Sequence, residues 1–379
     1  MDVTLKSFSM MIKLRYLKIE NGNLPRGLEY LPNSLRILDW TRYPSNSLPS
    51  HFNPQKLLEL SLCYNCIKHV RIGTEVYYNH YYHFVIIIAE YIMEAKFFPW
   101  FSLLMQPLCN LKTINLSHSL NLVSTPNFKG MPYLEFLYLE GCIRLYEVDP
   151  TIEVLERLTV LNLKDCKNLM HFTSSVHGLK YLKVLNLSGC SKLKKLPNDM
   201  GHLESLEELH VNGTDIRELP SSIGMLERLP VLKMEDCKDL VCLPSSVGGL
   251  KSLKGLNFSG CSKLEKLPEE LGDIQCLVEV NVSETSIKEL PCSIGMLEGL
   301  VSMSLRDCKH LMCLPSSVGG LKSLNDLNLS GCSKLDKLPD ELGHVACLEK
   351  LDVSGSGIRE LPSSIGLLKK PQRILSCWV

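Results

Sequence analysis

The stretch "LNLSGCSKL" at residues 185–193 occurs again as "LNFSGCSKL" at 256–264 and as "LNLSGCSKL" at 327–335. The copies start 71 residues apart, which is the sum of steps of 24, 24 and 23 residues between successive leucines. The copied text includes surface residues as well as apolar ones, which indicates duplication of three-unit blocks. The chain therefore has an internal period of about two dozen residues.

Aligned on its leucines, the chain follows the template L-x-x-L-x-L-x-x-[C/T/S/N] in eleven regular units. All 33 apolar positions of these units hold Leu, Ile, Val, Met or Phe, and at 45% hydrophobic content chance agreement is on the order of 10⁻¹¹. Three less regular units precede them, starting at Leu14, Leu35 and Leu57. The regular units start at Leu111, Leu134, Leu158, Leu182, Leu206, Leu229, Leu253, Leu277, Leu300, Leu324 and Leu348.

This period and spacing are those of a leucine-rich repeat. The alternating L-x-L core predicts a short strand whose leucines point inward and whose intervening residues point outward. The Leu-Pro pair that follows, as at Leu267 and Pro268, predicts a helical turn with proline at its first position. We therefore expect an α/β repeat fold, a leucine-rich repeat solenoid (horseshoe) with a parallel β-sheet on the concave face and short helical or irregular segments on the convex face.

Composition and charge narrow the classes of function. Lys and Arg together number 41, as do Asp and Glu, so no global field favours nucleic acid or an acidic membrane surface. The amino-terminal residues lack the continuous apolar region of an export signal. We expect a cytoplasmic protein, also able to enter the nucleus, whose 16 cysteines stay reduced.

Seven cysteines share the ninth template position, where other units have Thr or Ser. Small residues that bond the turn backbone belong there, so we expect a structural role. Neighbouring ninth positions permit a disulfide by distance alone, but a reducing compartment argues against one. "CYNC" at 63–66, followed by His69, resembles half of a zinc site without a second ligand pair, and we expect no metal and no cofactor. The seven are Cys142, Cys166, Cys190, Cys237, Cys261, Cys308 and Cys332.

Catalytic motifs are absent from the sequence. "VGGLKS" at 247–252 has leucine where a phosphate-binding loop needs glycine before its lysine. No G-x-S-x-G or H-E-x-x-H motif occurs, and no acidic pair stands apart from the repeat. We expect no enzyme activity and no small-molecule substrate.

The outward residues of the predicted strands are the candidate binding surface. Most template positions five and seven hold Asn or Ser, for which we expect a solvated role. Residues other than Asn or Ser at these positions are held at fixed spacing by a rigid scaffold. We expect them to determine which protein partner binds. These candidate residues are Tyr138, Glu140, Lys164, His210, Lys233, Glu235, Arg306 and Asp352.

One segment does not fit the template. Residues 71–107 are rich in aromatic side chains, and their uncharged runs are shorter than a membrane span. An interfacial hairpin, an inserted functional loop and a translated intron are the alternatives; we favour the intron because the repeat frame resumes at Leu111. The expected organisation is irregular repeats at 1–70, the insertion at 71–107, regular repeats at 108–368 and a tail at 369–379.

Several stretches resemble a known family. "LRILDWTRYPSNSLPSHF" (35–52), "LKTINLSHSLNLVSTPNF" (111–128) and "LEFLYLEGCIRLYEV" (134–148) are similar to the leucine-rich repeat region of plant intracellular disease-resistance proteins. The closest class carries a Toll/interleukin-1-receptor-like domain and a nucleotide-binding domain. The resemblance implies repeats that recognise a pathogen effector or a guarded host protein, or that contact other domains of a resistance protein and restrain its nucleotide switch.

The resemblance also implies a truncated chain, because neither the signalling domain nor the nucleotide-binding domain of the family is recognisable in the 379 residues. We therefore expect a non-enzymatic protein-recognition module of plant innate immunity. The alternatives are a leucine-rich repeat substrate adaptor or scaffold outside immunity, and a membrane-anchored receptor fragment. An adaptor needs a docking domain ahead of Leu14, and an anchor needs a span that residues 71–107 do not supply.

Overall fold

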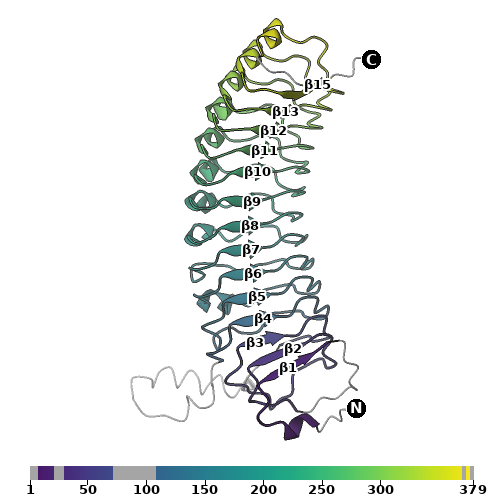
Figure 1. The fold of residues 1–379 in the computed structure, drawn as a ribbon, viewed down its shortest axis with the longest axis vertical. Coiled ribbons are helices and arrows are strands. Elements are labelled where there is room, and N and C mark those ends of the chain that lie inside the picture. The colour runs from purple at the N-terminus through teal and green to yellow at the C-terminus, as the bar shows by residue number, and fades with distance from the viewer. Residues whose placement is uncertain (1–6, 21–29, 71–107, 369–372, 376–379) are drawn as a thin grey trace.

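The computed structural model describes residues 7–20, 30–70, 108–368 and 373–375. Its strands form one 15-stranded sheet in which each strand pairs in parallel with the next one along the chain. Figure 1 shows the strands as an elongated stack, with the short helices along one side and turns along the other. The strands are β1 Tyr16–Ile19, β2 Ile37–Trp40, β3 Glu59–Ser61, β4 Thr113–Asn115, β5 Phe136–Tyr138, β6 Val160–Asn162, β7 Val184–Asn186, β8 Glu208–His210, β9 Val231–Lys233, β10 Gly255–Asn257, β11 Glu279–Asn281, β12 Ser302–Ser304, β13 Asp326–Asn328, β14 Lys350–Asp352 and β15 Arg373–Leu375.

Strand register follows the template. The fourth template position of each unit pairs with the fourth of the next, as Leu185 pairs with Leu209. Strand β3 pairs directly with β4, so the sheet continues across residues 71–107, which lie outside the described residues. Strand β15 adds backbone pairing to β14 within the segment that we expected to be a tail.

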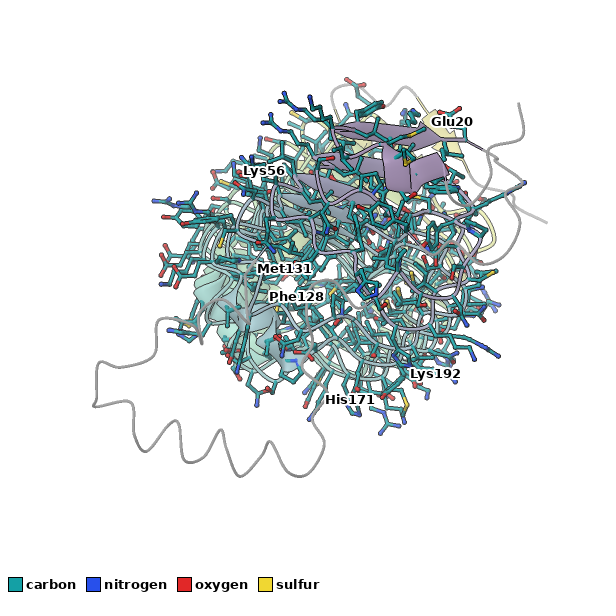
Figure 2. All side chains as sticks on the ribbon, turned by 90° about the horizontal axis from the view of Figure 1, so that it is seen from below. Glu20, Lys56, Phe128, Met131, His171 and Lys192 are labelled. Atoms are coloured by element: carbon teal, nitrogen blue, oxygen red, sulfur yellow. The ribbon has the colours of Figure 1, made fainter. Side chains whose placement is uncertain are left out.

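The core is a continuous column of aliphatic side chains. All 33 template side chains of the regular units are buried, none more than 5% exposed. Phe128 and Met131 also lie in the interior in the end-on view of Figure 2, whereas Lys192 and His171 lie at its rim. Because each leucine packs against the units before and after it, the repeat is stable only as a stack.

The helical segments of the described residues are all short 3₁₀ helices. In seven of them proline is the residue before the helix, with an extended conformation, so these helices begin one residue later than the sequence predicted. Proline stands inside the first turn in η2, which Asp149 caps through its side chain. The helices are η1 Ser7–Met10, η2 Pro150–Val154, η3 Met200–His202, η4 Ser221–Met225, η5 Ser245–Gly249, η6 Glu269–Asp273, η7 Cys292–Met296, η8 Ser316–Gly320, η9 Asp340–His344 and η10 Ser363–Leu367.

A column of left-handed residues follows the strands at template position eight. The turn there requires positive φ, which glycine adopts at no steric cost and other residues adopt at a cost of about 1 kcal/mol. From Arg42 to Gly331, each amide at this position donates to the carbonyl at position seven of the next unit, as Gly189 N donates to Asn212 O at 2.7 Å. The column comprises Arg42, Tyr64, His118, Gly141, Asp165, Gly189, Gly213, Asp236, Gly260, Glu284, Asp307, Gly331 and Gly355.

No helix among the described residues is long and apolar enough to cross a membrane.

Candidate functional site

The strand face that carries the candidate residues is built on a hydrogen-bonded ladder. The strand has ended at position seven, and the backbone amide there donates to the side-chain oxygen at position five, as Ser188 N donates to Asn186 Oδ1 at 3.0 Å. The same bond recurs at Asn115, Asn162, Asn257, Asn281 and Asn328. Solvation is therefore an incomplete account of the Asn/Ser pattern, because the asparagines also close the turn.

Asp352 belongs to this ladder. Its Oδ1 accepts from Ser354 N at 3.0 Å and from Ser354 Oγ at 2.5 Å, as the asparagine does in other units. The residue departs from the pattern in type and keeps its backbone role. Asp352 therefore adds a charge to the face without changing the turn.

The first group of candidates lies on β5 and in the turns that follow β5 and β6. Lys164 Nζ lies 3.2 Å from Glu140 Oε1, and Asn162 Nδ2 donates to Glu140 Oε2 at 3.2 Å. Tyr138 stacks in parallel with Phe136, with ring centroids 6.5 Å apart. The structure thus brings Tyr138, Glu140 and Lys164 together in two neighbouring units, as an aromatic pair and an ion pair on one face.

The second group lies on β8 and β9 and in the turn that follows β9. His210 Nε2 lies 3.1 Å from Glu208 Oε2, and Asn257 Nδ2 donates to Glu235 Oε1 at 2.8 Å. Burial, and then the charge of Lys233, lower the pKa of His210 below its ordinary value of 6.5, against the opposing effect of Glu208. Lys233 is exposed. Within the part of the chain that the structure describes, Lys233 makes no ion pair, and the lowered pKa leaves His210 neutral at pH 7, so Lys233 is the cation that this group presents there.

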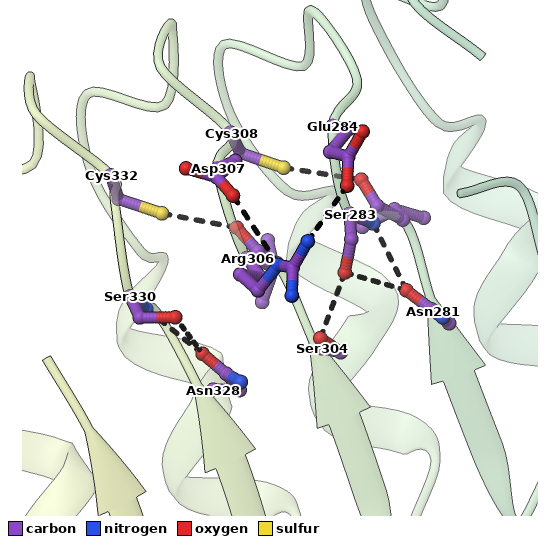
Figure 3. Close-up of polar contacts among 12 residues, drawn as sticks. Asn281, Ser283, Glu284, Ser304, Arg306, Asp307, Cys308, Asn328, Ser330 and Cys332 are labelled. Carbon is purple, nitrogen blue, oxygen red and sulfur yellow. Dashed lines mark hydrogen bonds and ion pairs between the residues drawn. The ribbon is translucent and has the colours of Figure 1, made fainter. Parts of the chain in front are cut away.

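Arg306 is the centre of a third group, shown in Figure 3. Its Nη2 lies 2.9 Å from Glu284 Oε1 and its Nε lies 3.3 Å from Asp307 Oδ2. Units with only Asn and Ser at positions five and seven separate this group from the second one. The eight candidates therefore share one face without forming a single cluster.

The sequence did not predict four side chains that contact the candidate residues. They are Phe136, Glu208, Glu284 and Asp307. Phe136 and Glu208 occupy template position three, which precedes the buried fourth position and therefore also points outward. Glu284 and Asp307 occupy position eight. The period-two alternation of a strand is the signal that could have added position three to the candidate face.

The ninth-position cysteines have the structural role predicted for them. Cys190 Sγ donates to Leu163 O and Cys332 Sγ to Leu305 O, at 3.2 and 3.1 Å, so each thiol bonds the turn of the preceding unit. Burial raises the pKa of Cys142, Cys190 and Cys332 to about 12, which keeps these thiols protonated. All seven ninth-position cysteines are free.

The "CYNC" residues have ordinary partners. Cys63 Sγ lies 3.8 Å from Ser61 Oγ, Cys66 is exposed, and His69 Nδ1 lies 3.5 Å from Ser124 Oγ. Within the described ranges, no group of three or more His, Cys, Asp or Glu side chains is arranged to hold a metal ion.

The in-register parallel stack with a buried leucine template defines a leucine-rich repeat solenoid. A family model described as a leucine-rich repeat region matches residues 135–263 and 231–334, together more than half of the chain, and the chain belongs to this family. The functional domain of InlJ from Listeria monocytogenes, a solved structure whose title says that it includes a cysteine ladder, has the same fold with a TM-score of 0.53 and 19% identity, over 89% of this chain and 66% of that one.

The curated relatives are plant disease-resistance proteins. Disease resistance-like protein DSC1 of Arabidopsis thaliana is 36% identical over 252 residues, covering 63% of this chain and 18% of that protein. Disease resistance protein RPP2A of Arabidopsis thaliana is 36% identical over 241 residues, covering 62% and 16%. The chain therefore matches less than a fifth of the length of these relatives.

Proposed function

We propose that the chain is a non-enzymatic recognition module of plant innate immunity, which binds another protein through the strand face of its repeats. The observation that carries the proposal is that the side chains departing from the Asn/Ser ladder all lie on one face, held in register by the sheet. The similarity to repeat regions of disease-resistance proteins supports the immune context.

The geometry suits protein recognition for a physical reason. Successive strands lie about 4.8 Å apart, so the three candidate groups have fixed relative positions before a partner arrives. Preorganised side chains lose little entropy on binding. The Lys164–Glu140 and Arg306–Glu284 pairs are partly exposed, and such pairs contribute only about 0–1 kcal/mol each, so a partner's charges can replace them at small cost.

The partner in this proposal is a pathogen effector, a guarded host protein or another domain of a resistance protein, met in the cytoplasm or the nucleus. The organisation proposed from the sequence, with irregular repeats at 1–70 and regular repeats at 108–368, places all eight candidate residues in the regular part.

The test is affinity purification from infected leaf extract, with bound proteins quantified by mass spectrometry. The strand-face variant combines Tyr138→Ala, Lys233→Glu and Arg306→Glu. The control, Lys251→Glu, changes an exposed lysine on the helical side. Proteins kept by the control and lost from the strand-face variant support the proposal, whereas identical bound sets for both variants contradict it.

A further inference from the structure

A second exposed surface runs along the turns that follow the strands. We call it the lateral edge. In each unit it runs from the residue after the ninth template position to the residue before the second buried residue that follows. In the first five units from Leu57 it comprises 66–69, 120–124, 143–147, 167–171 and 191–195. These turns lie on the side of the sheet opposite the short helices (Figure 1).

Apolar side chains occupy successive rungs of this edge. Leu120, Ile143, Tyr146 and Met170 are 52%, 39%, 46% and 47% exposed. Backbone bonds fix the adjacency of Val123, Tyr146 and Met170 on three successive rungs, because Tyr146 N donates to Val123 O at 3.2 Å and Met170 N donates to Tyr146 O at 3.1 Å. Leu120 and Ile143 are exposed on the same turns as Val123 and Tyr146, so exposed apolar surface runs over three successive units.

The same position in later units lacks this continuity. Val241 and Met312 are also about half exposed, at 48% and 52%. The residues on the preceding rung are charged there, since Val241 N donates to Arg217 O and Met312 N donates to Lys288 O. Single exposed apolar residues between charged rungs are ordinary surface features, whereas a contiguous patch marks an interaction site.

The charge of the edge also changes along the chain. In the first five units one acidic residue, Glu147, accompanies six basic ones. From Leu206 onward, the equivalent turns carry nine basic and seven acidic residues. There Lys263 pairs with Asp239 at 2.6 Å and Lys288 with Glu265 at 2.7 Å. The six basic residues are Lys68, Arg144, Lys167, Lys192, Lys194 and Lys195.

The cations beside the apolar patch keep their charge uncompensated. Arg144 Nη1 reaches Asn121 Oδ1 at 3.2 Å, and Lys192 Nζ reaches Asn168 Oδ1 at 2.7 Å, so both have neutral amide partners. Among the residues that the structure describes, none of the six basic side chains makes an ion pair. The first five units thus present exposed apolar groups beside an excess of positive charge, six basic residues against Glu147, in a chain whose formal net charge is zero.

We propose that this part of the lateral edge binds an extended segment of a partner protein in which acidic residues alternate with apolar ones. The apolar side chains would cover Ile143, Tyr146 and Met170, and the carboxylates would pair with Arg144 and Lys192. Charge complementarity selects an acidic partner, and the apolar centre favours a peptide over a phosphate backbone, which offers no apolar group to this patch. The proposal is independent of the strand face, because it uses none of its residues.

The probe is a short labelled synthetic peptide in which Asp or Glu alternates with Leu or Phe, and its binding to the full chain is followed by fluorescence anisotropy at low salt. Tyr146→Ser with Met170→Ser removes the apolar patch, and Val241→Ser with Met312→Ser is the matched control at the isolated positions. Lys192→Glu reverses a charge at the patch, and Lys334→Glu does so in the identical "SGCSKL" context two blocks later.

We expect the double serine variant and Lys192→Glu each to weaken binding by about tenfold or more, since central aromatic and charged contacts carry most of the affinity of an interface. The two controls should change it by less than about twofold. Absence of peptide binding to the unmodified chain, or equal losses in patch and control variants, would overturn the proposal. Equal binding of polyglutamate, an oligonucleotide or anionic vesicles would also overturn it, because charge alone would then suffice. Unchanged thermal unfolding of each variant confirms that the fold is intact.

Discussion

Replacing a glycine of the stacked 3₁₀ helices should destabilise the chain only where a neighbouring helix covers it. A Cβ atom on Gly224 would lie 2.0 Å from Ser246 O, and one on Gly295 would lie 2.0 Å from Ser317 O. At Gly366, the same position in the last block, no described atom lies within 4 Å. The sheet fixes the spacing of the units at about 4.8 Å, so the helices cannot separate without breaking strand pairing.

The magnitude follows from two opposing effects. Overpacking costs about 1–3 kcal/mol, whereas replacing glycine by alanine within a helix gains about 0.5–1 kcal/mol. Gly224→Ala and Gly295→Ala should therefore each lower the free energy of unfolding by about 1–2 kcal/mol. Gly366→Ala should leave it unchanged or raise it by up to about 1 kcal/mol.

Urea unfolding followed by far-ultraviolet circular dichroism measures the difference, with the midpoint compared among the three variants. Their sequence contexts, "SSIGM" at 221–225, "CSIGM" at 292–296 and "SSIGL" at 363–367, are nearly identical, so local propensity cancels. If Gly366→Ala lowers the midpoint as much as Gly224→Ala does, the close packing of successive helices is not what requires glycine.

Three further substitutions test separate parts of the structure. Asn186→Ala should cost about 1 kcal/mol in unfolding experiments because Ser188 N loses its acceptor, while Asn186→Asp should cost less. Cys261→Ser should cost about 1 kcal/mol or less, because Ser can make the same bond to the turn backbone at this template position in other units. Cys261→Leu should cost about 1–3 kcal/mol through overpacking. Equal costs for the two substitutions would contradict the role assigned to the cysteine. The folded pKa of His210 is lowered, so its contribution to stability is present above pH 6.5 and is lost as the pH falls through the folded pKa. A pH titration of the unfolding midpoint should therefore show a smaller acid loss for His210→Asn than for the unmodified chain.

The sheet could be predicted from the sequence because its register depends on the apolar template alone. Leu185 and Leu209 pair since each unit must bury the same positions against its neighbours. The left-handed column at position eight was not predicted, because residues as different as Gly189, Asp236 and Tyr64 occupy it. Backbone bonding to the next unit enforces that conformation, and no single residue type marks it.

The sequence predicted which side chains of the candidate face point outward, but it did not predict which of them form ion pairs. Alternation along a strand places Lys164 and Arg306 on the outward face. Their partners, Glu140 and Glu284, come from neighbouring units, and the two pairs use different template positions. Which charged side chains form ion pairs therefore depends on how far each one extends toward the neighbouring unit. The linear template of apolar positions does not specify this distance.

The central claim, that the repeats form one parallel in-register stack whose outward residues share a face, can be tested by oxidative cross-linking and peptide mapping. Asn162 and Asn186 are Cα partners on adjacent strands, whereas Asn162 and Asn257 lie on β6 and β10. Adjacent parallel strands lie about 4.8 Å apart, which permits a disulfide, and the remote pair about 19 Å apart, which does not. We predict a cross-link in the Asn162→Cys, Asn186→Cys variant and none in Asn162→Cys, Asn257→Cys. A cross-link between the remote pair, or none between the adjacent pair, would contradict the account.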